Sequence, residues 1–353
     1  MINKPTLFLD KEKTLNNIDR MGSKFLEQRI HFQPHAKTHQ SRAIANWFRD
    51  FGVNSLTVSS TEMLSYFAND QWDKLLLALP IHPVIFRQLN DWNNKIDLTV
   101  ISSSLKHIST FNSILDKPIK LLIDCDPEYG RTGIPIHDHE SISILINEVK
   151  ALKNIQLSGC YLHAGHSYNC SSIEEIQRFY SSQSEHIKAL KNTFETPIYF
   201  GDTPTCSVAN NFGNIDVATP GNFVFYDLMQ ATIGSCNVED ISIELACPVI
   251  DWKSNGNQDQ LIIHGGAVHF SKDSMIINGQ TIYGQLSGYP NIYVHKLSQE
   301  HGLIYGPIPL IEVLAEQTQV NIYPVHSCLT AQSMGFYIDR ENGLEYDHMS
   351  KKH

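Results

Sequence analysis

The sequence predicts an α/β protein: a (β/α)8, TIM-type barrel with a C-terminal mostly-β domain. Short apolar runs alternate with helical patterns from about residue 10 to about residue 235. Eight of these runs have the length and composition of strands, and helical segments separate most of them, which is typical of a parallel barrel. Near residue 240 the alternation stops, and strands then follow one another with turns between them. A doubly wound open sheet would give a similar alternation in the first part.

The barrel region begins with a helix. Asp10 is a suitable N-cap, and Leu15, Ile18, Met21, Phe25 and Leu26 after it keep helical spacing. The predicted strands are Ile30–Gln33, Ser55–Val58, Leu75–Leu79, Leu98–Ile101, Ile119–Ile123, Leu157–Leu162, Ile198–Phe200 and Ile215–Ala218. The predicted helices between them are Arg42–Phe48, Thr61–Ala68, Pro83–Asp91, Leu105–Leu115, Glu140–Leu152 and Ile173–Lys191.

The C-terminal part is predicted to be built mainly of strands. They are expected at Ile241–Ile250, Gln260–His264, Met275–Ile277, Asn291–Leu297 and Gln319–Pro324, with turns at Ser254-Asn255-Gly256 and Asn278-Gly279. The extended run Thr6–Leu9 is expected to pair with this domain. We therefore expect a barrel over residues 10–238 and a β domain made of residues 1–9 and 239–353.

Composition narrows the classes of function. The net charge is −10, and no basic run stands out, so a nucleic-acid partner is not expected. No apolar stretch is long enough to span a bilayer, so we expect no membrane partner. The seven cysteines are scattered without a CxxC pair, which favours a reduced, cytoplasmic protein.

One lysine follows the first barrel strand in the segment Pro34-His35-Ala36-Lys37-Thr38-His39. The carboxyl edge of the strands is where barrels of this type build active sites. Lysine forms Schiff bases with carbonyl cofactors once burial or a neighbouring cation lowers its pKa. The flanking histidines, His35 and His39, could supply that environment. A solvated lysine in a loop is the alternative for this segment taken alone.

Other polar residues follow the fifth and sixth strands. Arg131, in Arg131-Thr132-Gly133, carries a fixed charge that could hold a phenolate or a carboxylate, although capping and salt-bridging arginines are common. The segment His163-Ala164-Gly165-His166-Ser167-Tyr168 places two histidines and a tyrosine where they could hydrogen-bond a cofactor ring or relay protons. The histidines could equally belong to the core.

The loops after strands seven and eight are candidates for a phosphate site. They contain Gly201-Asp202-Thr203-Pro204-Thr205 and Pro220-Gly221-Asn222. Glycines let backbone N–H groups approach an anion, hydroxyls add donors, and barrels often bind phosphate at these two loops. Each loop by itself could be an ordinary turn.

A possible metal pair lies in the β domain, in Pro324-Val325-His326-Ser327-Cys328. If this segment is a strand, His326 and Cys328 project from the same face and can reach one ion. Nitrogen and sulfur together suit Zn²⁺. Glu300 or His301 could supply a third ligand, although a surface loop is the simpler interpretation of that segment.

Taken together, these segments resemble the fold-type III enzymes that depend on pyridoxal 5′-phosphate (PLP) and are related to alanine racemase, in the D-serine dehydratase and D-threonine aldolase branch. Besides the segments above, Tyr226-Asp227 and Leu297-Ser298-Gln299-Glu300-His301-Gly302 match the family, and the matches run in order over nearly the whole chain. Where relatives usually carry small residues, this chain has Pro127-Glu128-Tyr129.

The resemblance implies roles for individual residues. Lys37 would form the Schiff base with PLP and act as the catalytic base, and Arg131 would lie near the phenolic oxygen of the pyridoxal ring. Tyr168 would border the ring and the substrate, and His163 would belong to the cofactor site. Thr203, Gly221 and Asn222 would contact the phosphate, and His326 and Cys328 would hold a metal ion, zinc or else manganese. The family also implies a homodimer.

The resemblance further implies loss of water from a D-3-hydroxyamino acid, with D-serine giving pyruvate and ammonia. The metal would act as a Lewis acid on the β-hydroxyl. D-threonine aldolases carry a carboxylate where this chain has Cys328, and zinc-dependent D-serine dehydratases carry a cysteine. Retro-aldol cleavage to glycine and an aldehyde is the first alternative. An amino-acid racemase is a weaker one, because no residue matches the tyrosine base of alanine racemase, and a non-catalytic PLP-binding protein is another.

Overall fold

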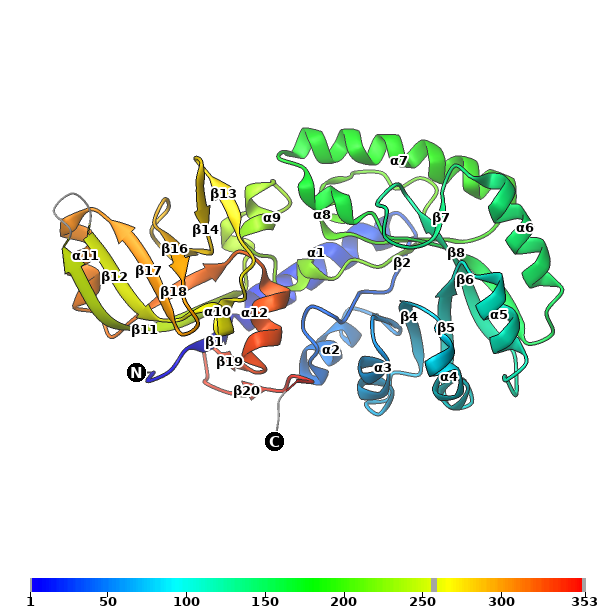
Figure 1. The fold of residues 1–353 in the computed structure, drawn as a ribbon, viewed down its shortest axis with the longest axis horizontal. Coiled ribbons are helices and arrows are strands. Elements are labelled where there is room, and N and C mark those ends of the chain that lie inside the picture. Colours follow the sequence, from blue (N-terminus) through cyan, green and yellow to red (C-terminus); the bar gives the residue numbers. More distant parts are fainter. Residues whose placement is uncertain (1, 255–258, 351–353) are drawn as a thin grey trace. The chain divides into compact units, whose positions relative to one another are not determined.

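The structure, a computed structural model, describes residues 2–254 and 259–350 and divides them into two compact units. The barrel unit consists of residues 19–37 and 46–221, and the β unit consists of residues 1–18, 38–45 and 222–353 without the undescribed positions. Each unit has its own sheet and its own core (Figure 1). Among the described residues, no helix has the length and apolar character needed to cross a membrane.

The barrel unit contains the eight predicted strands, all parallel. In chain order they are β2 (His31–Phe32), β3 (Leu56–Val58), β4 (Lys74–Pro80), β5 (Asp97–Ser102), β6 (Ile119–Asp126), β8 (Ile155–Leu162), β9 (Ile198–Phe200) and β10 (Val217–Ala218). They pair in the order β2-β10-β9-β8-β6-β5-β4-β3. A parallel bridge between His35 and Thr57 joins the two ends of this path, so the sheet closes. The prediction of a closed barrel is confirmed, and the open sheet is excluded.

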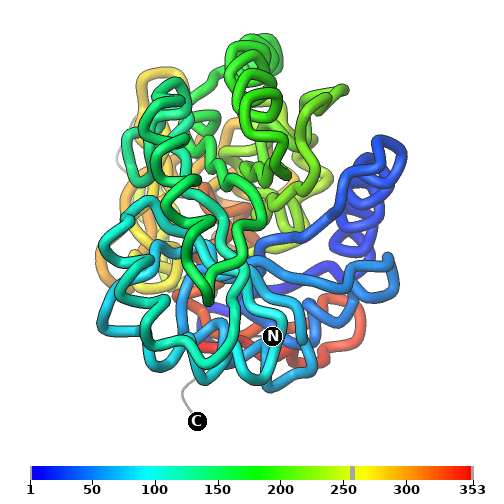
Figure 2. The backbone as a smooth tube through the Cα atoms, turned by 90° about the vertical axis from the view of Figure 1, so that its right-hand side faces the viewer, coloured from blue at the N-terminus to red at the C-terminus, as the bar shows by residue number. Residues whose placement is uncertain are grey.

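Helices separate these strands along the chain. Figure 2 shows the course of the backbone in a second view, in which the helices are seen as coils. They are α1 (Lys11–Glu27), α2 (Arg42–Arg49), α3 (Thr61–Ala68), α4 (Phe86–Asn93), α5 (Leu105–Asn112), α6 (His139–Lys150), α7 (Ile173–Phe194) and α8 (Thr203–Val208). Side-chain N-caps fix several starts: Ser60 accepts from Met63 N–H at the start of α3, and Ser172 accepts from Glu175 N–H at the start of α7. All predicted helices are confirmed, and α8 was missed.

Side chains from neighbouring strands fill the core of the barrel unit. Leu76 of β4, Ile101 of β5, Leu122 of β6 and Tyr161 of β8 form one buried cluster. Strands of a closed parallel sheet are covered on both faces, which is why they appear in the sequence as continuous apolar runs. The predicted site residues of the barrel unit lie in the loops that follow the carboxyl ends of these strands.

The β unit is built on one nine-stranded sheet. Its strands are β1 (Thr6–Leu9), β11 (Ile243–Ser254), β12 (Asp259–His264), β15 (Gly284–Leu286), β16 (Tyr293–Leu297), β17 (His301–Gly306), β18 (Gln319–Pro324), β19 (Tyr337–Asp339) and β20 (Glu345–Tyr346). Because β12 pairs with both β17 and β11, six of them close into a second, mainly antiparallel ring. The predicted pairing of Thr6–Leu9 with this domain is confirmed by its antiparallel register with β11.

Turns and short helices complete the β unit. β13 (Met275–Ile277) and β14 (Gln280–Ile282) form a hairpin whose turn, Asn278-Gly279, has φ of 50° and 76°, as predicted for this dipeptide. The predicted turn at Ser254-Asn255-Gly256 lies partly outside the described residues. The sequence interpretation missed α9 (Leu228–Thr232), α10 (Ala267–Phe270), α11 (Ile308–Ala315) and α12 (Ser327–Met334).

Two buried histidines of the β unit make its stability sensitive to acid. Burial lowers the pKa of His39 to about 3 and that of His348 to about 4. The unfolded chain takes up both protons near pH 6.5, whereas the folded chain does so only near pH 3–4, so stability falls as the pH drops below 6.5. Between pH 7 and pH 5 we expect each histidine to remove about 2 kcal/mol from the free energy of unfolding, measured by urea titration.

The matched variants separate this effect from general acid sensitivity. His348→Gln should flatten the pH dependence by about 2 kcal/mol over the same interval, because one of the two proton uptakes is gone. His137→Gln, whose side chain is 60% exposed, should leave the dependence as it is. An unchanged slope in His348→Gln would contradict the assignment.

Candidate functional site

Lys37 lies at the carboxyl end of the first barrel strand, in a turn that backbone bonds fix. Ala36 N–H donates to Thr57 O at 2.8 Å, and Thr57 N–H donates to Pro34 O at 2.9 Å, which attaches this turn to β3. The backbone N–H of Lys37 donates to His35 Nδ1 at 3.2 Å, and the lysine side chain is half-buried. The turn therefore holds one amine at the edge where barrels place their chemistry.

The two flanking histidines contribute to this turn in different ways. His35 serves as a backbone acceptor for Lys37 and so shapes the turn. His39 is buried with a pKa of about 3, because burial disfavours its charged form, so it supplies no positive charge at neutral pH.

His163 follows β8 and is held as a neutral ring. Its Nδ1–H donates a hydrogen bond to Gly201 O at 2.6 Å, which leaves Nε2 as an acceptor. Burial, together with the positive charges of Lys37 and Arg131, lowers its pKa to about 3. These three predicted residues therefore lie within electrostatic reach of one another.

Tyr129 belongs to the same group, although the sequence interpretation gave it no role. Its ring stacks on His166 with centroids 5.7 Å apart and meets the edge of His163 at 5.9 Å. The guanidinium of Arg131 lies over the ring at 5.5 Å. Asp126 Oδ1 accepts from the backbone N–H of Tyr129 at 2.7 Å and so fixes the turn that carries the ring. The unusual segment before Arg131 thus covers the histidines with an aromatic side chain.

Thr203 and Tyr168 are placed by one buried carboxylate, Asp202. Asp202 caps α8 by accepting from Thr205 N–H at 2.7 Å, and its Oδ1 also accepts from Ser167 Oγ at 2.8 Å. Thr203 is fully buried as the first residue of that helix, rather than part of a loop. Tyr168 is half-buried in the turn that contains Ser167. The hydrogen bond between Ser167 and Asp202 therefore joins the predicted segment after β8 to the one after β9.

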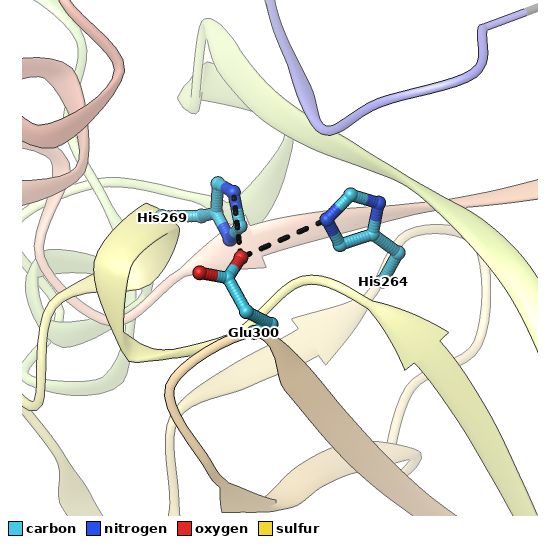
Figure 3. A group of neighbouring side chains, drawn as sticks. All are labelled: His264, His269 and Glu300. Atoms are coloured by element: carbon cyan, nitrogen blue, oxygen red, sulfur yellow. Dashed lines mark ion pairs between the residues drawn. The ribbon is translucent and has the colours of Figure 1, made fainter.

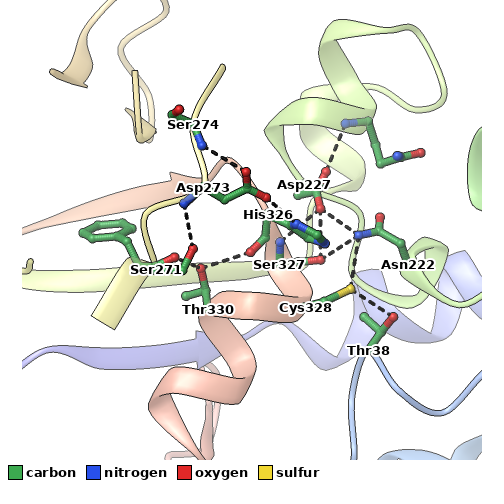
Figure 4. A network of polar contacts seen from close by, with 12 residues as sticks. Thr38, Asn222, Asp227, Ser271, Asp273, Ser274, His326, Ser327, Cys328 and Thr330 are labelled. Atoms are coloured by element: carbon green, nitrogen blue, oxygen red, sulfur yellow. Dashed lines mark hydrogen bonds and ion pairs between the residues drawn. The ribbon is translucent and has the colours of Figure 1, made fainter. Parts of the chain in front are cut away.

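Asn222 lies in the β unit, where Asp227 organises its surroundings (Figure 4). Its Nδ2 donates to Asp227 Oδ2 at 2.7 Å and to Ser327 Oγ at 3.0 Å. The same carboxylate oxygen accepts from Ser327 N–H at 3.0 Å. Asn222 Nδ2 also approaches Cys328 Sγ at 3.6 Å. The amide nitrogen is therefore directed at the start of α12; the predicted phosphate contacts of Asn222 and of Gly221 remain predictions.

The His326–Cys328 segment is not a strand, and that part of the interpretation is wrong. β18 ends at Pro324, His326 is the N-cap position of α12, and Cys328 lies in the first turn of that helix. The hydrogen bonds of Asp227 to the helix start favour the helical continuation. The two side chains nevertheless interact, and Cys328 contributes to the electrostatics of His326.

A carboxylate that the sequence did not reveal orients His326. Asp273 Oδ2 lies 2.6 Å from His326 Nδ1 (Figure 4). Burial lowers the pKa of His326, but the bonds to Asp273 and Cys328 outweigh burial and raise it to about 11, while His326 lowers the pKa of Asp273. A carboxylate on one ring nitrogen typically fixes a histidine that binds a metal through the other. Thr38 Oγ1, 3.2 Å from Cys328 Sγ, completes the surroundings of the sulfur.

These donor sets fit the groups that the family implies. The barrel unit offers an amine for an aldehyde, a guanidinium for a phenolic oxygen and a buried hydroxyl on Thr203 for a phosphate, all at strand carboxyl ends. The β unit offers an imidazole and a sulfur with a carboxylate behind the imidazole, which suits zinc. Asp273 and His326 are 53 positions apart in the sequence, so no local motif pointed to Asp273 as the partner of the histidine.

Family comparisons agree with this division. Residues 9–223 match the model described as "Alanine racemase, N-terminal domain", and residues 242–338 match "Putative serine dehydratase domain". The chain is 25% identical to D-serine dehydratase of Dictyostelium discoideum, over 100% of this chain and 97% of that protein.

Solved structures show the same fold. D-threo-3-hydroxyaspartate dehydratase from Delftia sp. HT23 has a TM-score of 0.89 at 22% identity, covering 99% of this chain and 98% of that one. A cysteine-to-alanine mutant of the hydroxyaspartate enzyme was solved in a metal-free form. D-threonine aldolase from Filomicrobium marinum has a TM-score of 0.85 at 16% identity, covering 98% and 95%. Because the first family model covers more than half of the chain, the protein belongs to the alanine racemase-like, fold-type III family of PLP-dependent enzymes.

Proposed function

We propose that the protein is a PLP- and metal-dependent dehydratase of D-3-hydroxyamino acids, with D-serine converted to pyruvate and ammonia. The observation that carries the proposal is the His326–Cys328 pair with Asp273 bound to the histidine. A metal at this pair would act as a Lewis acid on a β-hydroxyl, which is what departure of hydroxide requires. The D-serine dehydratase relative supports the same reaction.

The barrel residues supply binding and proton transfer. PLP, when bound, would delocalise the electron pair that remains at Cα after proton removal. Lys37 would hold the cofactor and would take the Cα proton on Nζ. Arg131 would balance the negative charge of the phenolic oxygen. His163, kept neutral by burial and by its cationic neighbours, would accept a hydrogen bond without adding charge. Thr203, Gly221 and Asn222 would bind the phosphate, and Tyr168 would border the substrate.

The β-unit residues supply the leaving-group assistance. His326 would present Nε2 to the metal while Asp273 accepts from its Nδ1. Cys328 would contribute sulfur, with the Thr38 hydroxyl and the Asn222 amide beside it. D-serine without one water would be released as an enamine, which would tautomerise to an imine in solution, and one water would hydrolyse the imine to pyruvate and ammonia. A single base at Lys37 reaches one face of Cα, which gives D selectivity.

Cys328 separates this reaction from its first alternative. Retro-aldol cleavage needs a base at the hydroxyl, and the aldolase branch carries a carboxylate at the second metal position. The sulfur at position 328 therefore favours dehydration. The metal-free structure of a cysteine mutant of the hydroxyaspartate dehydratase supports a cysteine-linked metal in such enzymes. We propose zinc as the ion, with manganese as the alternative.

Identification of products tests the proposal directly. The purified protein, supplied with PLP and zinc, is incubated with D-serine, D-threonine, D-threo-3-hydroxyaspartate and L-serine as the stereochemical control. We expect keto acid and ammonia in a one-to-one ratio from the D-substrates and no product from L-serine. Glycine and an aldehyde would replace the proposal by the aldolase reaction, and inversion at Cα with solvent deuterium would replace it by racemisation.

The working form is also part of the proposal. We propose a homodimer in the cytoplasm, supported by the family expectation and by seven scattered cysteines without a CxxC pair. Light scattering of the PLP-loaded protein tests the dimer, which should have twice the chain mass of 40.0 kDa.

A further inference from the structure

We propose that His264, His269 and Glu300 form a second metal site, for a divalent transition ion of the zinc type. Their ligand atoms all lie within 4.8 Å of one another. The site is built from different residues than the His326–Cys328 pair, and the proposed dehydration does not use it. Two imidazoles and one carboxylate are a donor set that zinc accepts in proteins, with a fourth position left for water.

The backbone brings these three residues together. His264 ends β12 and is the register partner of His301 on β17, so Glu300 lies directly beside this strand end. Gly265 N–H donates to Glu300 O at 3.0 Å, and Val268 N–H donates to Gln299 O at 3.2 Å. The chain between the histidines is therefore bonded to the segment that carries the carboxylate.

The glycine between the histidines makes this approach possible. A Cβ at Gly266 would lie 2.3 Å from Gln299 O and 2.5 Å from the carbonyl carbon of Glu300, closer than side-chain carbons are found. The short helix α10 begins immediately after it and places His269 opposite His264. The two rings have centroids 5.4 Å apart and an interplanar angle of 87°. The frame thus brings both rings close to Glu300.

The spacing within the cluster fits an ion better than direct bonds. Glu300 Oε2 lies 3.8 Å from His264 Nε2 and 3.9 Å from His269 Nε2, with the carboxylate between the rings (Figure 3). These distances are too long for hydrogen bonds. Ligand atoms about 2.1 Å from a tetrahedral zinc lie roughly 3.4 Å apart, so each histidine nitrogen would have to move about half an ångström closer to the carboxylate oxygen to share an ion with it.

A hydrogen bond decides which ring nitrogen of His269 faces the cluster. Gly266 N–H donates to His269 Nδ1 at 3.2 Å, which places the ring proton on Nε2 in the metal-free protein. Metal binding at Nε2 would move that proton to Nδ1 and release the contact with Gly266. The ring stays neutral, and no net proton is lost from it.

The site would join three elements of the β unit and remain open to solvent. His264 comes from β12, His269 from α10 and Glu300 from the residue before β17. The side chains are 34%, 16% and 46% exposed, so an ion can enter and keep a water ligand. α10 also bonds to α12, because Thr330 Oγ1 donates to Phe270 O at 3.2 Å. An ion here would stabilise the segment on which α12 rests.

Zinc titration of the PLP-loaded protein by calorimetry, after removal of metal with a chelator, tests the proposal. We expect two ions per chain in the wild-type protein and one in His326→Ala/Cys328→Ala, where only the proposed site remains. In that double variant, Co²⁺ should give visible d–d bands without the thiolate charge-transfer band, because no sulfur is in the site. Adding His269→Ala or Glu300→Gln should weaken this ion by more than about 100-fold, the upper end of what loss of a supporting hydrogen bond costs.

A matched control variant shows whether the loss of zinc affinity is specific to the three proposed ligands. His301→Gln changes an exposed neighbour of Glu300 outside the cluster and should leave the affinity unchanged. A double variant that binds no ion would overturn the proposal. So would an ion that binds equally well after Glu300→Gln and after His269→Ala, since both side chains are partly exposed and their replacement leaves the core intact.

Discussion

Lys37→Ala is expected to abolish the absorption band of lysine-bound PLP and to lower kcat for D-serine by about 10³-fold or more. The side chain would both hold the cofactor and take the Cα proton, and general-base catalysis alone contributes about 10²–10⁴-fold. The measurement is an absorbance spectrum of the purified variant after PLP is added, followed by pyruvate formation under saturating substrate.

Lys120→Ala is the matched control for this change. Lys120 lies near the amino end of β6, at the opposite edge of the barrel strands, where it pairs with Asp97 at 2.7 Å. Its replacement removes an exposed ion pair and should change stability by about 1 kcal/mol or less. We expect its spectrum and kcat to equal those of the wild type. A Lys37→Ala protein with an unchanged PLP spectrum would remove the lysine from the mechanism.

Cys328→Ala is expected to lower dehydration of D-serine by about 100-fold or more and to release the ion at His326. A Lewis acid that assists the departure of hydroxide lowers the activation free energy by several kcal/mol, and about 2.7 kcal/mol corresponds to 100-fold in rate. Metal content and kcat are measured together in a chain that also carries Glu300→Gln, so that an ion at the second proposed site does not add to the number of ions per chain. Cofactor absorbance should persist, because Lys37 is untouched.

Three further variants sharpen this result. Cys328→Asp should keep an ion but dehydrate more slowly, because the sulfur ligand is what distinguishes the dehydratase branch; dehydration at the wild-type rate would remove the main support for that assignment. Asp273→Asn should weaken the ion by about 10–100-fold, as expected for a residue that orients a ligand. Cys236→Ala, a half-buried cysteine of the same unit, should change neither quantity.

The eight barrel strands could be found from the sequence because burial on both faces leaves an apolar run for each one. Ile198–Phe200 was predicted to the residue. The helix α12 of the β unit was missed for the opposite reason. It contains Ser327, Thr330 and Gln332, so its sequence lacks a clear apolar stripe, and Asp227 accepts hydrogen bonds from its start.

Site residues that directly follow a predicted strand could be found from the sequence, whereas contacts made only in the folded chain could not. Lys37, Arg131 and His163 each follow a predicted strand, and the closed parallel sheet gathers such positions at one edge. Tyr129 lies two residues from Arg131, yet only its ring contacts showed what it covers. The neutral state of His39 could not be predicted, because burial is a property of the packed chain.

By itself, the sequence determined the order of strands and helices, the family and the residue types available for catalysis, because these depend on periodicity and on short local motifs. Only the tertiary structure decided which carboxylate serves which histidine: Asp273 meets His326, and Glu300 lies between His264 and His269. These partners come from segments tens of residues apart. Their distances follow from strand register and helix packing, which no spacing along the chain encodes.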